Sequence, residues 1–261
     1  MKTVSIVIPV HNCESTIRRS LMSIQNQTYK DYEVIVVNNN CTDGTISIVK
    51  EFKDKFDLKI VDCEIPGIVP SLNTGIRHVQ GKYIARQDGD DYWYDTKLEK
   101  QINFLDSNPD VGVLGTQITI LDTNGNIQEK GTMGIEIVYP TMDDDCRRMM
   151  IYGENPICHP SVVIREELLR LTGGYEKVFP KAEDLHLWLK LFPHTKFANL
   201  EETLVDYTQT FSPDYDARVP LVMSDMYFGL YKMAGLIQGE KEKRIWDWER
   251  SPDHHGNVTG Q

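Results

Sequence analysis

The chain has 261 residues, of which 40% are hydrophobic and 26% charged, which is enough for a single α/β domain with a sizeable core. Its formal net charge is −11, and this acidic balance argues against nucleic acid or an anionic membrane as the main partner. An anionic nucleotide is not excluded as a ligand, because a bound metal ion can neutralise its charge locally.

The cysteine content and the hydropathy indicate a cytoplasmic protein. The five cysteines are odd in number and include no CxxC pair, so neither a disulfide framework nor a zinc site is expected. The first residues enter a strand-like run without a signal peptide, and no apolar run reaches the roughly 18 residues of a membrane span. We therefore expect no transmembrane segment, and at most a peripheral association with a membrane.

The first third of the chain alternates between predicted strands and helices. Short apolar runs rich in β-branched residues predict buried parallel strands at residues 4–8 and 33–37, and two further strands are predicted at 58–61 and 83–86. Helices are predicted between them, at about residues 14–27, 44–55 and 67–78. This alternation is typical of an α/β fold with a mostly parallel central sheet flanked by helices. Ligands bind such sheets at the carboxyl ends of the strands, so three polar segments should meet at one edge: Pro9–Asn12, Asn38–Cys41 and Asp88–Asp91.

The second half of the chain has a less regular pattern. The expected elements, in order, are a helix at about 96–107, a strand at 111–121, a hairpin turn at Asn124–Gly125 and a helix at 141–151. A strand should follow His159, and a helix with one buried face should begin near Glu183. The segment 216–247 can form one or two helices that pack on the core, pair with another subunit or rest on a membrane. A polar, disordered tail is expected from residue 251.

Three carboxylates lie within four positions at the end of the fourth predicted strand. They belong to Asp88, Asp90 and Asp91, and Gly89 separates the first from the second. Clustered carboxylates repel one another unless a cation or hydrogen-bond donors compensate their charge. Oxygen ligands on a tight turn suit a hard divalent ion such as Mn²⁺ or Mg²⁺. Taken by itself, the same pattern is also compatible with a solvated turn that caps the next helix.

Seven short segments, in this order and spacing, resemble the family 2 glycosyltransferases, which have the GT-A fold. The segments lie at residues 5–12, 42–45, 72–76, 81–91, 159–162, 173–175 and 183–185. The resemblance implies a GT-A domain over residues 1–210, with a nucleotide-sugar-binding half (1–95) and a less regular acceptor half (96–210). A helical segment at 211–250 and the tail at 251–261 would follow.

The resemblance also implies an activity. The protein would transfer a hexosyl or N-acetylhexosaminyl group, with inversion, from a nucleotide-diphospho-sugar, expected to be a UDP-sugar, to a hydroxyl group. The transfer would depend on a divalent metal, Mn²⁺ or Mg²⁺, which stabilises charge on the diphosphate leaving group. The acceptor would be a glycan, a lipid-linked or another hydroxyl compound in polysaccharide or glycoconjugate synthesis. Assembly as a homo-oligomer is left open.

By the same resemblance, the acidic residues divide into two groups. Asp90 is expected to bind the metal directly, and Asp88 to support the metal or the ribose, with Gly89 between them in the donor site. Asp184 is the expected base that takes the proton of the acceptor hydroxyl, with Glu183 beside it. An alternative for Asp184 is the N-cap of the helix that follows.

Further residues are expected around the donor and the acceptor. The remaining donor-binding set comprises Pro9, His11, Asn12, Glu14, Asn38, Asn39 and Asn73, and the acceptor-side set comprises His159 and Asp91. Structural alternatives stay open for five of them: His11 as a surface residue, Glu14 as an anion at a helix N-terminus, Asn73 as a helix residue satisfied by the backbone, His159 as a core residue and Asp91 as a helix cap.

Two positions depart from the family pattern. Relatives usually carry two aspartates after the second strand, where this chain has Asn38 and Asn39. An asparagine carbonyl can also accept from a uracil N–H, so a uracil base is compatible but the base preference is open. Many relatives have Tyr-Arg-x-His where this chain has Tyr207-Thr208-Gln209-Thr210. Either the metal then has one protein ligand fewer, or a nearby residue such as Asp214 or Asp216 replaces the histidine.

Two other functions are compatible with parts of the sequence. The departures would suit a nucleotide-sugar-binding protein that has lost catalysis, but the presence of Asp88, Asp90 and Asp184 opposes it. A sugar nucleotidylyltransferase shares the early strand–helix order and the need for a metal. Such enzymes usually hold a triphosphate with a glycine-rich loop after the first strand, and Pro9–Asn12 contains no glycine.

Overall fold

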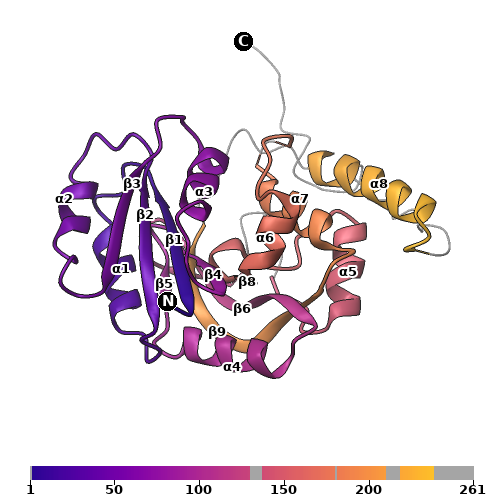
Figure 1. Cartoon of the computed structure of the whole chain (residues 1–261), viewed down its shortest axis with the longest axis horizontal. Coiled ribbons are helices and arrows are strands. Elements are labelled where there is room, and N and C mark those ends of the chain that lie inside the picture. The colour runs from indigo at the N-terminus through magenta and orange to yellow at the C-terminus, as the bar shows by residue number, and fades with distance from the viewer. Residues whose placement is uncertain (1, 130–136, 180, 210–217, 238–261) are drawn as a thin grey trace, which may run out of the picture.

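A computed structural model describes residues 2–129, 137–179, 181–209 and 218–237. Within these ranges nine strands form one sheet, in the order β3-β2-β1-β4-β8-β6-β9-β5 with β7 paired to β6 (Figure 1). The strands are β1 (Val4–Val10), β2 (Tyr32–Asn38), β3 (Asp57–Asp62), β4 (Tyr83–Arg86), β5 (Tyr92–Trp93), β6 (Val111–Leu121), β7 (Ile127–Gln128), β8 (Val163–Arg165) and β9 (Lys196–Thr208). The helices are α1 (Ile17–Gln25), α2 (Thr45–Lys50), α3 (Ile68–Ile76), α4 (Lys97–Ser107), α5 (Asp143–Ile151), the 3₁₀ turn η1 (His159–Ser161), α6 (Glu166–Thr172), α7 (Glu183–Leu191) and α8 (Arg218–Met233).

The first half of the sheet is parallel, as the sequence predicts. β1 lies between β2 and β4 and is parallel to both, and β3 pairs with the far side of β2. Successive side chains of β1 point to opposite faces of the sheet and so enter two different cores. Ile6 and Ile8 belong to the core that contains buried residues of α1, α2 and α4, whereas Val7 belongs to the core on the other face, with buried residues of α3, α5, α6 and α7. Burial on both faces is the reason that β1 is a nearly continuous apolar run.

The second half makes the sheet mixed rather than mostly parallel. β8 is antiparallel to both β4 and β6, and β9 is parallel to β6 but antiparallel to β5. Figure 1 shows β9 as a long curved strand that runs between α4 and the group of α5, α6 and α7. Because β9 pairs with β5, its end at Thr208 lies next to the turn that connects β4 to β5.

Most predicted elements are confirmed, but two strands and one α-helix of the described residues, besides the 3₁₀ turn η1, were not predicted. The hairpin between β6 and β7 turns at Gly125, whose φ of +83° glycine adopts without strain. The unpredicted elements are β5, α6 and β9. β5 has only two residues, and β9 carries the exposed residues Glu201 and Glu202 in its middle, so neither forms a recognisable apolar run.

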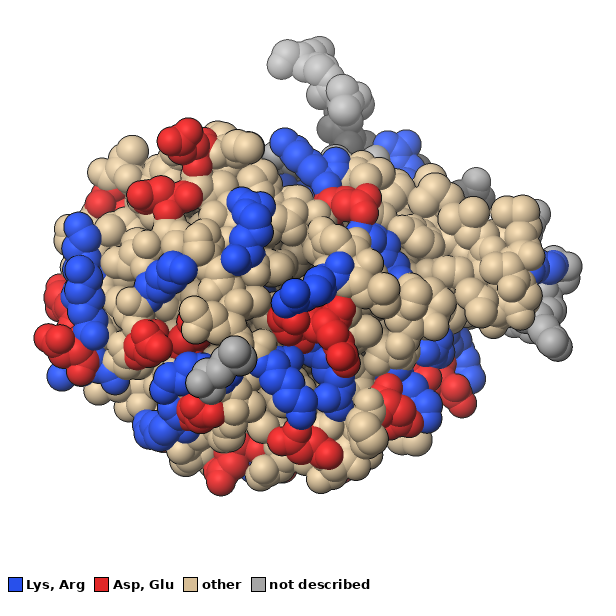
Figure 2. All heavy atoms as spheres, in the orientation of Figure 1, with Lys and Arg blue, Asp and Glu red and all other residues tan. Residues whose placement is uncertain are grey.

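Helix α8 packs on the core, which was one of three possibilities for its segment. Met223 and Tyr231 are buried against α5 and α7. The other face exposes Val222, Met226 and Leu230, and Figure 2 shows few charged side chains over this part of the surface. Among the described residues, no helix combines the length and apolar content needed to cross a membrane. Residues 238–247 of the predicted helical segment and the predicted tail from 251 lie outside the described ranges.

Candidate active site

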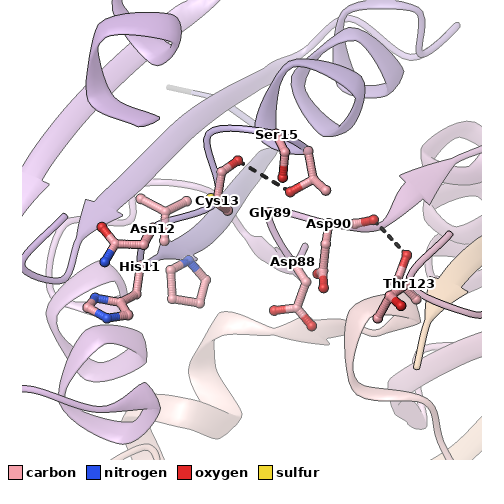
Figure 3. A pocket seen from close by; sticks show the side chains of 12 residues that line it. His11, Asn12, Cys13, Ser15, Asp88, Gly89, Asp90 and Thr123 are labelled. Carbon is pink, nitrogen blue, oxygen red and sulfur yellow. Dashed lines mark hydrogen bonds between the residues drawn. The ribbon is translucent and has the colours of Figure 1, made fainter. Parts of the chain in front are cut away.

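A cavity of about 390 Å³ lies at the carboxyl ends of β1 and β4, the edge at which the sequence predicts ligand binding (Figure 3). The loop after β1, the turn after β4, the turn between β6 and β7 and the end of β9 all contribute to it. The predicted residues that line it are Pro9, His11, Asn12, Asp88, Gly89 and Asp90, and Cys13, Thr123 and Thr208 join them. Segments far apart in the sequence therefore form one site.

The turn after β4 brings three carboxylates together. One carboxylate oxygen from each of Asp88, Asp90 and Asp91 lies within 4.8 Å of the other two. Thr208 holds the turn from β9: its N–H donates to Asp91 Oδ1 at 2.7 Å, and its hydroxyl donates to the Asp90 carbonyl oxygen at 2.8 Å. Gly89 permits a close approach of the turn to the loop after β1, since a Cβ there would lie 2.7 Å from the sulfur of Cys13.

Burial and repulsion by neighbouring carboxylates make Asp90 and Asp91 hold protons tightly. Burial, and then the charge of Asp88, raise the pKa of Asp90 to about 6. Asp91 is fully buried, and burial together with its two acidic neighbours raises its pKa well above the usual range. Its Oδ2 has no hydrogen-bond partner among the described residues. A hard divalent cation would compensate these charges with oxygen ligands, so the residues present fit the predicted Mn²⁺ or Mg²⁺.

The helix-cap alternative for Asp91 is wrong. Asp91 is followed by the short strand β5, and the next helix, α4, has Thr96 at its N-cap. The carboxylate instead accepts a hydrogen bond from the end of β9, as described above. Asp91 thus belongs to the cluster that stabilises the turn itself.

A buried arginine lies behind the acidic turn. Arg86, the last residue of β4, is 6% exposed, and its Nη2 lies 2.5 Å from Asp88 Oδ1. Its Nε and Nη1 are buried and have no hydrogen-bond partner among the described residues. Burial lowers the pKa of Arg86, but the negative charges around it, with that of Asp88 first and those of Asp91 and Glu183 after it, raise the pKa overall. Its place near these acidic residues could not be predicted from the sequence.

The second acidic pair lies at the start of α7. Ala182 is the N-cap of this helix and Glu183 and Asp184 form its first turn, so the N-cap alternative for Asp184 is not what the structure shows. Burial raises the pKa of both carboxyl groups, and the charge of Asp184 raises that of Glu183 further. The charge of Arg86 lowers both of these pKa values, as it lowers that of Asp90. Arg86 is therefore a cation near both acidic groups.

The two asparagines after β2 are engaged within the protein. Asn39 is buried: its amide nitrogen donates to two backbone carbonyls of the segment 63–65, at 3.1 and 2.8 Å, and its Oδ1 accepts from the N–H of Gly67 at 2.8 Å. Asn38 donates to Asp62 Oδ1 at 2.8 Å. Neither side chain lines the cavity. Base reading by these side chains stays a prediction, and for Asn39 it would require these hydrogen bonds to break.

His11 and Asn12 lie at one side of the cavity (Figure 3). His11 Nδ1 lies 2.7 Å from the carbonyl oxygen of Asn39, so this nitrogen carries the proton and donates it. Asn12 has a left-handed φ of 48°, and its Oδ1 accepts from the N–H of Thr42 at 2.8 Å. These contacts orient the exposed His11 ring, which a stacking role would require.

Three predicted residues make their contacts inside the protein and do not line the cavity. Glu14 Oε2 accepts at 2.8 Å from the N–H of Gly44, the N-cap residue of α2, so it lies at the start of another helix than the one predicted from residue 14. The Nδ2 of Asn73 donates to the carbonyl oxygen of Tyr175 at 2.8 Å, and its Oδ1 accepts from the N–H of the same residue at 3.0 Å. His159 Nε2 lies 2.8 Å from the hydroxyl of the same tyrosine, and burial holds the pKa of His159 well below its usual range.

Thr123 and Thr208 line the cavity, although neither was predicted as a site residue. Thr208 stands in the segment where the family pattern is broken, and its two hydrogen bonds hold the acidic turn. Thr123 is in the turn between β6 and β7, which no motif marks. Thr210, Asp214 and Asp216, discussed above as replacements for a metal ligand, lie outside the described residues.

Comparison with known proteins identifies relatives along most of the chain. Residues 5–170 match the family described as Glycosyl transferase family 2, a stretch that contains the acidic turn and ends before α7. EpsE of Bacillus subtilis, which is named as a glycosyltransferase, is 34% identical over 207 residues. The alignment covers 77% of this chain and 71% of EpsE.

Solved structures share the predicted GT-A fold. TarS of S. aureus, residues 1–349 in complex with UDP-GlcNAc, has a TM-score of 0.66 at 22% identity, covering 83% of this chain and 62% of that one. The mannosyltransferase PcManGT from Pyrobaculum calidifontis, in complex with GDP-Man and Mn²⁺, has a TM-score of 0.60 at 20% identity, covering 91% of this chain and 65% of that one. The chain thus spans less than two thirds of either solved chain. Identities this low establish the shared fold alone.

Proposed function

The chain belongs to glycosyl transferase family 2, and from this premise we propose that it transfers a sugar from a nucleotide-diphospho-sugar to an acceptor hydroxyl. The observation that carries the proposal is the presence of two acidic groups near one buried arginine, Arg86. One group, the turn from Asp88 to Asp91, borders the cavity and suits a metal-bound diphosphate. The other, Glu183 and Asp184, suits the removal of a proton.

Asp90 and Asp88 are the proposed ligands of a divalent metal ion, with Asp91 supporting the turn behind them. When bound, the ion would stabilise the negative charge that develops on the leaving diphosphate. Thr208 keeps the turn in shape, and Arg86 offsets part of its negative charge. The Mn²⁺ in the PcManGT complex supports the choice of metal.

Asp184 is the proposed base, with Glu183 beside it. The acceptor oxygen forms a bond to the anomeric carbon while the bond from that carbon to the diphosphate oxygen breaks, and its electron pair leaves with the diphosphate. The hydroxyl proton passes to the Asp184 carboxylate. One displacement of this kind inverts the anomeric configuration. A positioned base contributes roughly 10²–10⁴-fold to the rate, and a pKa raised by burial makes a carboxylate a stronger base.

The proposed donor is a UDP-sugar, with a hexose or an N-acetylhexosamine as the sugar. The UDP-GlcNAc in the TarS complex supports a UDP donor, while the GDP-Man in the PcManGT complex keeps guanine as the second candidate base. His11 is the proposed stacking partner of the base, because its ring is exposed at the cavity and held by a hydrogen bond. The proposed acceptor is a growing glycan or glycoconjugate, which supplies the hydroxyl.

The test compares wild type with Asp184→Asn and, as a matched control, Glu183→Gln. UDP-glucose, UDP-N-acetylglucosamine and GDP-mannose are supplied with Mn²⁺, and release of the nucleoside diphosphate is measured alongside calorimetric binding of UDP and GDP. We expect metal-dependent turnover by wild type, and a loss of roughly 10²-fold or more in Asp184→Asn with binding and melting temperature nearly unchanged. Normal turnover by Asp184→Asn would remove its role as base. Tight nucleotide binding by wild type without turnover of any donor would support the binding protein instead.

A further inference from the structure

A side-chain amide outside the predicted site is hydrogen-bonded to the proposed base. Asn155 lies between α5 and η1, 29 positions before Asp184, and its Nδ2 donates to Asp184 Oδ2 at 2.6 Å. Its Oδ1 accepts from Trp188 Nε1 at 3.0 Å and from the N–H of Ile157 at 3.3 Å. Neither the motifs of the sequence nor the match to residues 5–170 assigns Asn155 a role.

The chemistry of its neighbours fixes which end of the amide faces the carboxylate. The indole nitrogen of Trp188 and the backbone nitrogen of Ile157 can only donate, so they require the carbonyl end of Asn155. The amino end must then point at Asp184, which can only accept when it is ionised. Trp188 is fully buried and lies four residues after Asp184, on the same face of α7. The amide therefore bridges two consecutive turns of one helix.

We propose that Asn155 is a positioning residue, whose amide fixes the carboxylate of Asp184 in the orientation and the ionised form needed to take the acceptor's proton. This inference rests on the proposed function of Asp184. Asn155 holds Oδ2, and the N–H of Leu185 holds Oδ1 at 2.8 Å, so the carboxylate cannot rotate about its bond to the Cβ without breaking one of them. Each oxygen keeps a second lone pair for the incoming proton.

The same contacts determine when Asp184 is charged. Burial raises the pKa of Asp184, and the N–H of Leu185, the amide of Asn155 and the charge of Arg86, in that order, lower it. The other titratable groups that face it are Glu183, Tyr139 and Tyr175, which are neutral when protonated. Asn155 is thus one of three groups that keep the half-buried carboxylate of Asp184 ionised. Removal of the Asn155 amide should therefore make Asp184 lose its proton at a higher pH.

The experiment uses Asn155→Asp and Asn155→Ala in the full chain, with Mn²⁺ and UDP-glucose or UDP-N-acetylglucosamine hydrolysis as the assay. Asn155→Asp is isosteric and still accepts from Trp188 and Ile157, but it places a carboxylate where the donor stood. We expect the acid limb of kcat to move up by about one pH unit or more in both variants, further in Asn155→Asp, with little change in KM for the donor. The carboxyl carbon of Asp184, followed by ¹³C NMR, should titrate at higher pH to the same extent.

The NMR titration keeps the inference testable in a variant that is inactive or turns over too slowly to assay. Trp188→Phe provides a milder perturbation, because it removes one of the two donors that orient the amide while keeping an aromatic ring in the core; a partial shift is expected. If activity falls equally at all pH values and Asp184 titrates as in wild type, Asn155 has a structural role only and the inference is wrong. If Asp184→Asn turns over donor normally, the proposed function of Asp184 fails instead, which is a separate result.

Discussion

Nη2 of Arg86 lies 2.5 Å from Oδ1 of Asp88, and the two side chains are only 8% and 23% exposed. Breaking a buried ion pair by removing one partner leaves the other charge uncompensated, which is more costly than the pair is stabilising. Here the remaining charge would stand beside Asp90 and Asp91, which already hold protons tightly. A change in the charge of the acidic turn should therefore change the stability of the protein through Arg86, the last residue of β4.

We expect Arg86→Met to lower the free energy of unfolding by about 1–3 kcal/mol in the presence of EDTA, because it leaves the half-buried Asp88 carboxylate at the cavity without its cation. Arg86→Lys, the matched control, keeps a cation and should lose less. Urea denaturation measures both. Mn²⁺ should recover more stability in Arg86→Met than in wild type, since the ion supplies the missing positive charge. Equal losses in the two variants would show that the guanidinium shape matters and its charge does not.

Asp90→Asn should stabilise the metal-free protein at neutral pH. Burial and Asp88 raise the pKa of Asp90 from 3.8 to about 6, so its contribution to stability is full below pH 3.8 and is lost as the pH rises through 6. A shift of about two units corresponds to about 3 kcal/mol. In EDTA, the melting temperature of the variant should exceed that of wild type clearly at pH 7.5 and only slightly at pH 4.5. The gain in melting temperature that Mn²⁺ and UDP give to wild type should disappear in the variant, and a retained gain would exclude Asp90 as a ligand.

Asn39→Asp should destabilise the protein rather than simply alter the base preference. The exchange is nearly isosteric, but both N–H groups of the amide donate to backbone carbonyls, and a carboxylate would set oxygen against oxygen at 2.8–3.1 Å. We expect a loss of about 1–3 kcal/mol or more, measured by urea denaturation. Asn38→Asp is the comparison variant. Its new carboxylate would face the carboxylate of Asp62, to which the Asn38 amide donates. If Asn39→Asp unfolds like wild type and changes the ratio of UDP to GDP affinity, the residue reads the base as first predicted.

Gly89→Ala should disturb the acidic turn through a single contact. The added Cβ would lie 2.7 Å from the sulfur of Cys13, closer than side chains tolerate, so the turn or the loop after β1 must move. We expect a loss of about 1–3 kcal/mol and weaker Mn²⁺-dependent UDP binding. The double variant Cys13→Ala/Gly89→Ala should recover most of the lost stability and most of the Mn²⁺-dependent UDP binding. Gly229→Ala, in α8 with no atom within 4 Å of the new Cβ, is the control and should be neutral or slightly stabilising.

The parallel half of the fold was predictable because its signals are local. β1, β2 and β4 are short apolar runs buried on both faces, and polar turns mark their ends. β3 is a partly exposed strand at the edge of the sheet, and its alternating apolar residues still mark it in the sequence. The acidic turn could be located for the same reason, since three carboxylates after a buried strand are conspicuous in any sequence. β9 could not be found in this way, because it alternates between buried segments and the exposed Glu201 and Glu202 while it crosses the edge of the core.

The parts of the site that escaped prediction are those whose role depends on a distant partner. Arg86 is one residue among four buried ones in β4, and only the structure shows which carboxylate it faces. Asn73 and Asn39 carry amides typical of ligand contacts, yet their partners are backbone groups of other segments of the same chain. A sequence shows that a polar side chain is present. It does not show whether that side chain is free to bind a ligand or already hydrogen-bonded to a segment that the fold brings close.

The hydrogen bond from Thr208 to Asp91 joins residues 117 positions apart, and it has a consequence for synthesis on the ribosome. β1 to β4 can pair as soon as they emerge, but the partners of β4 and β5 in the second half, β8 and β9, are translated much later. Until then the growing chain presents an unpaired edge of β4 followed by the acidic turn, in which Asp91 lacks the N–H donor of Thr208. Such an edge is open to wrong pairing, whereas the charge beside it discourages association with other chains. The acidic turn would thus protect the nascent chain before it can serve as a site.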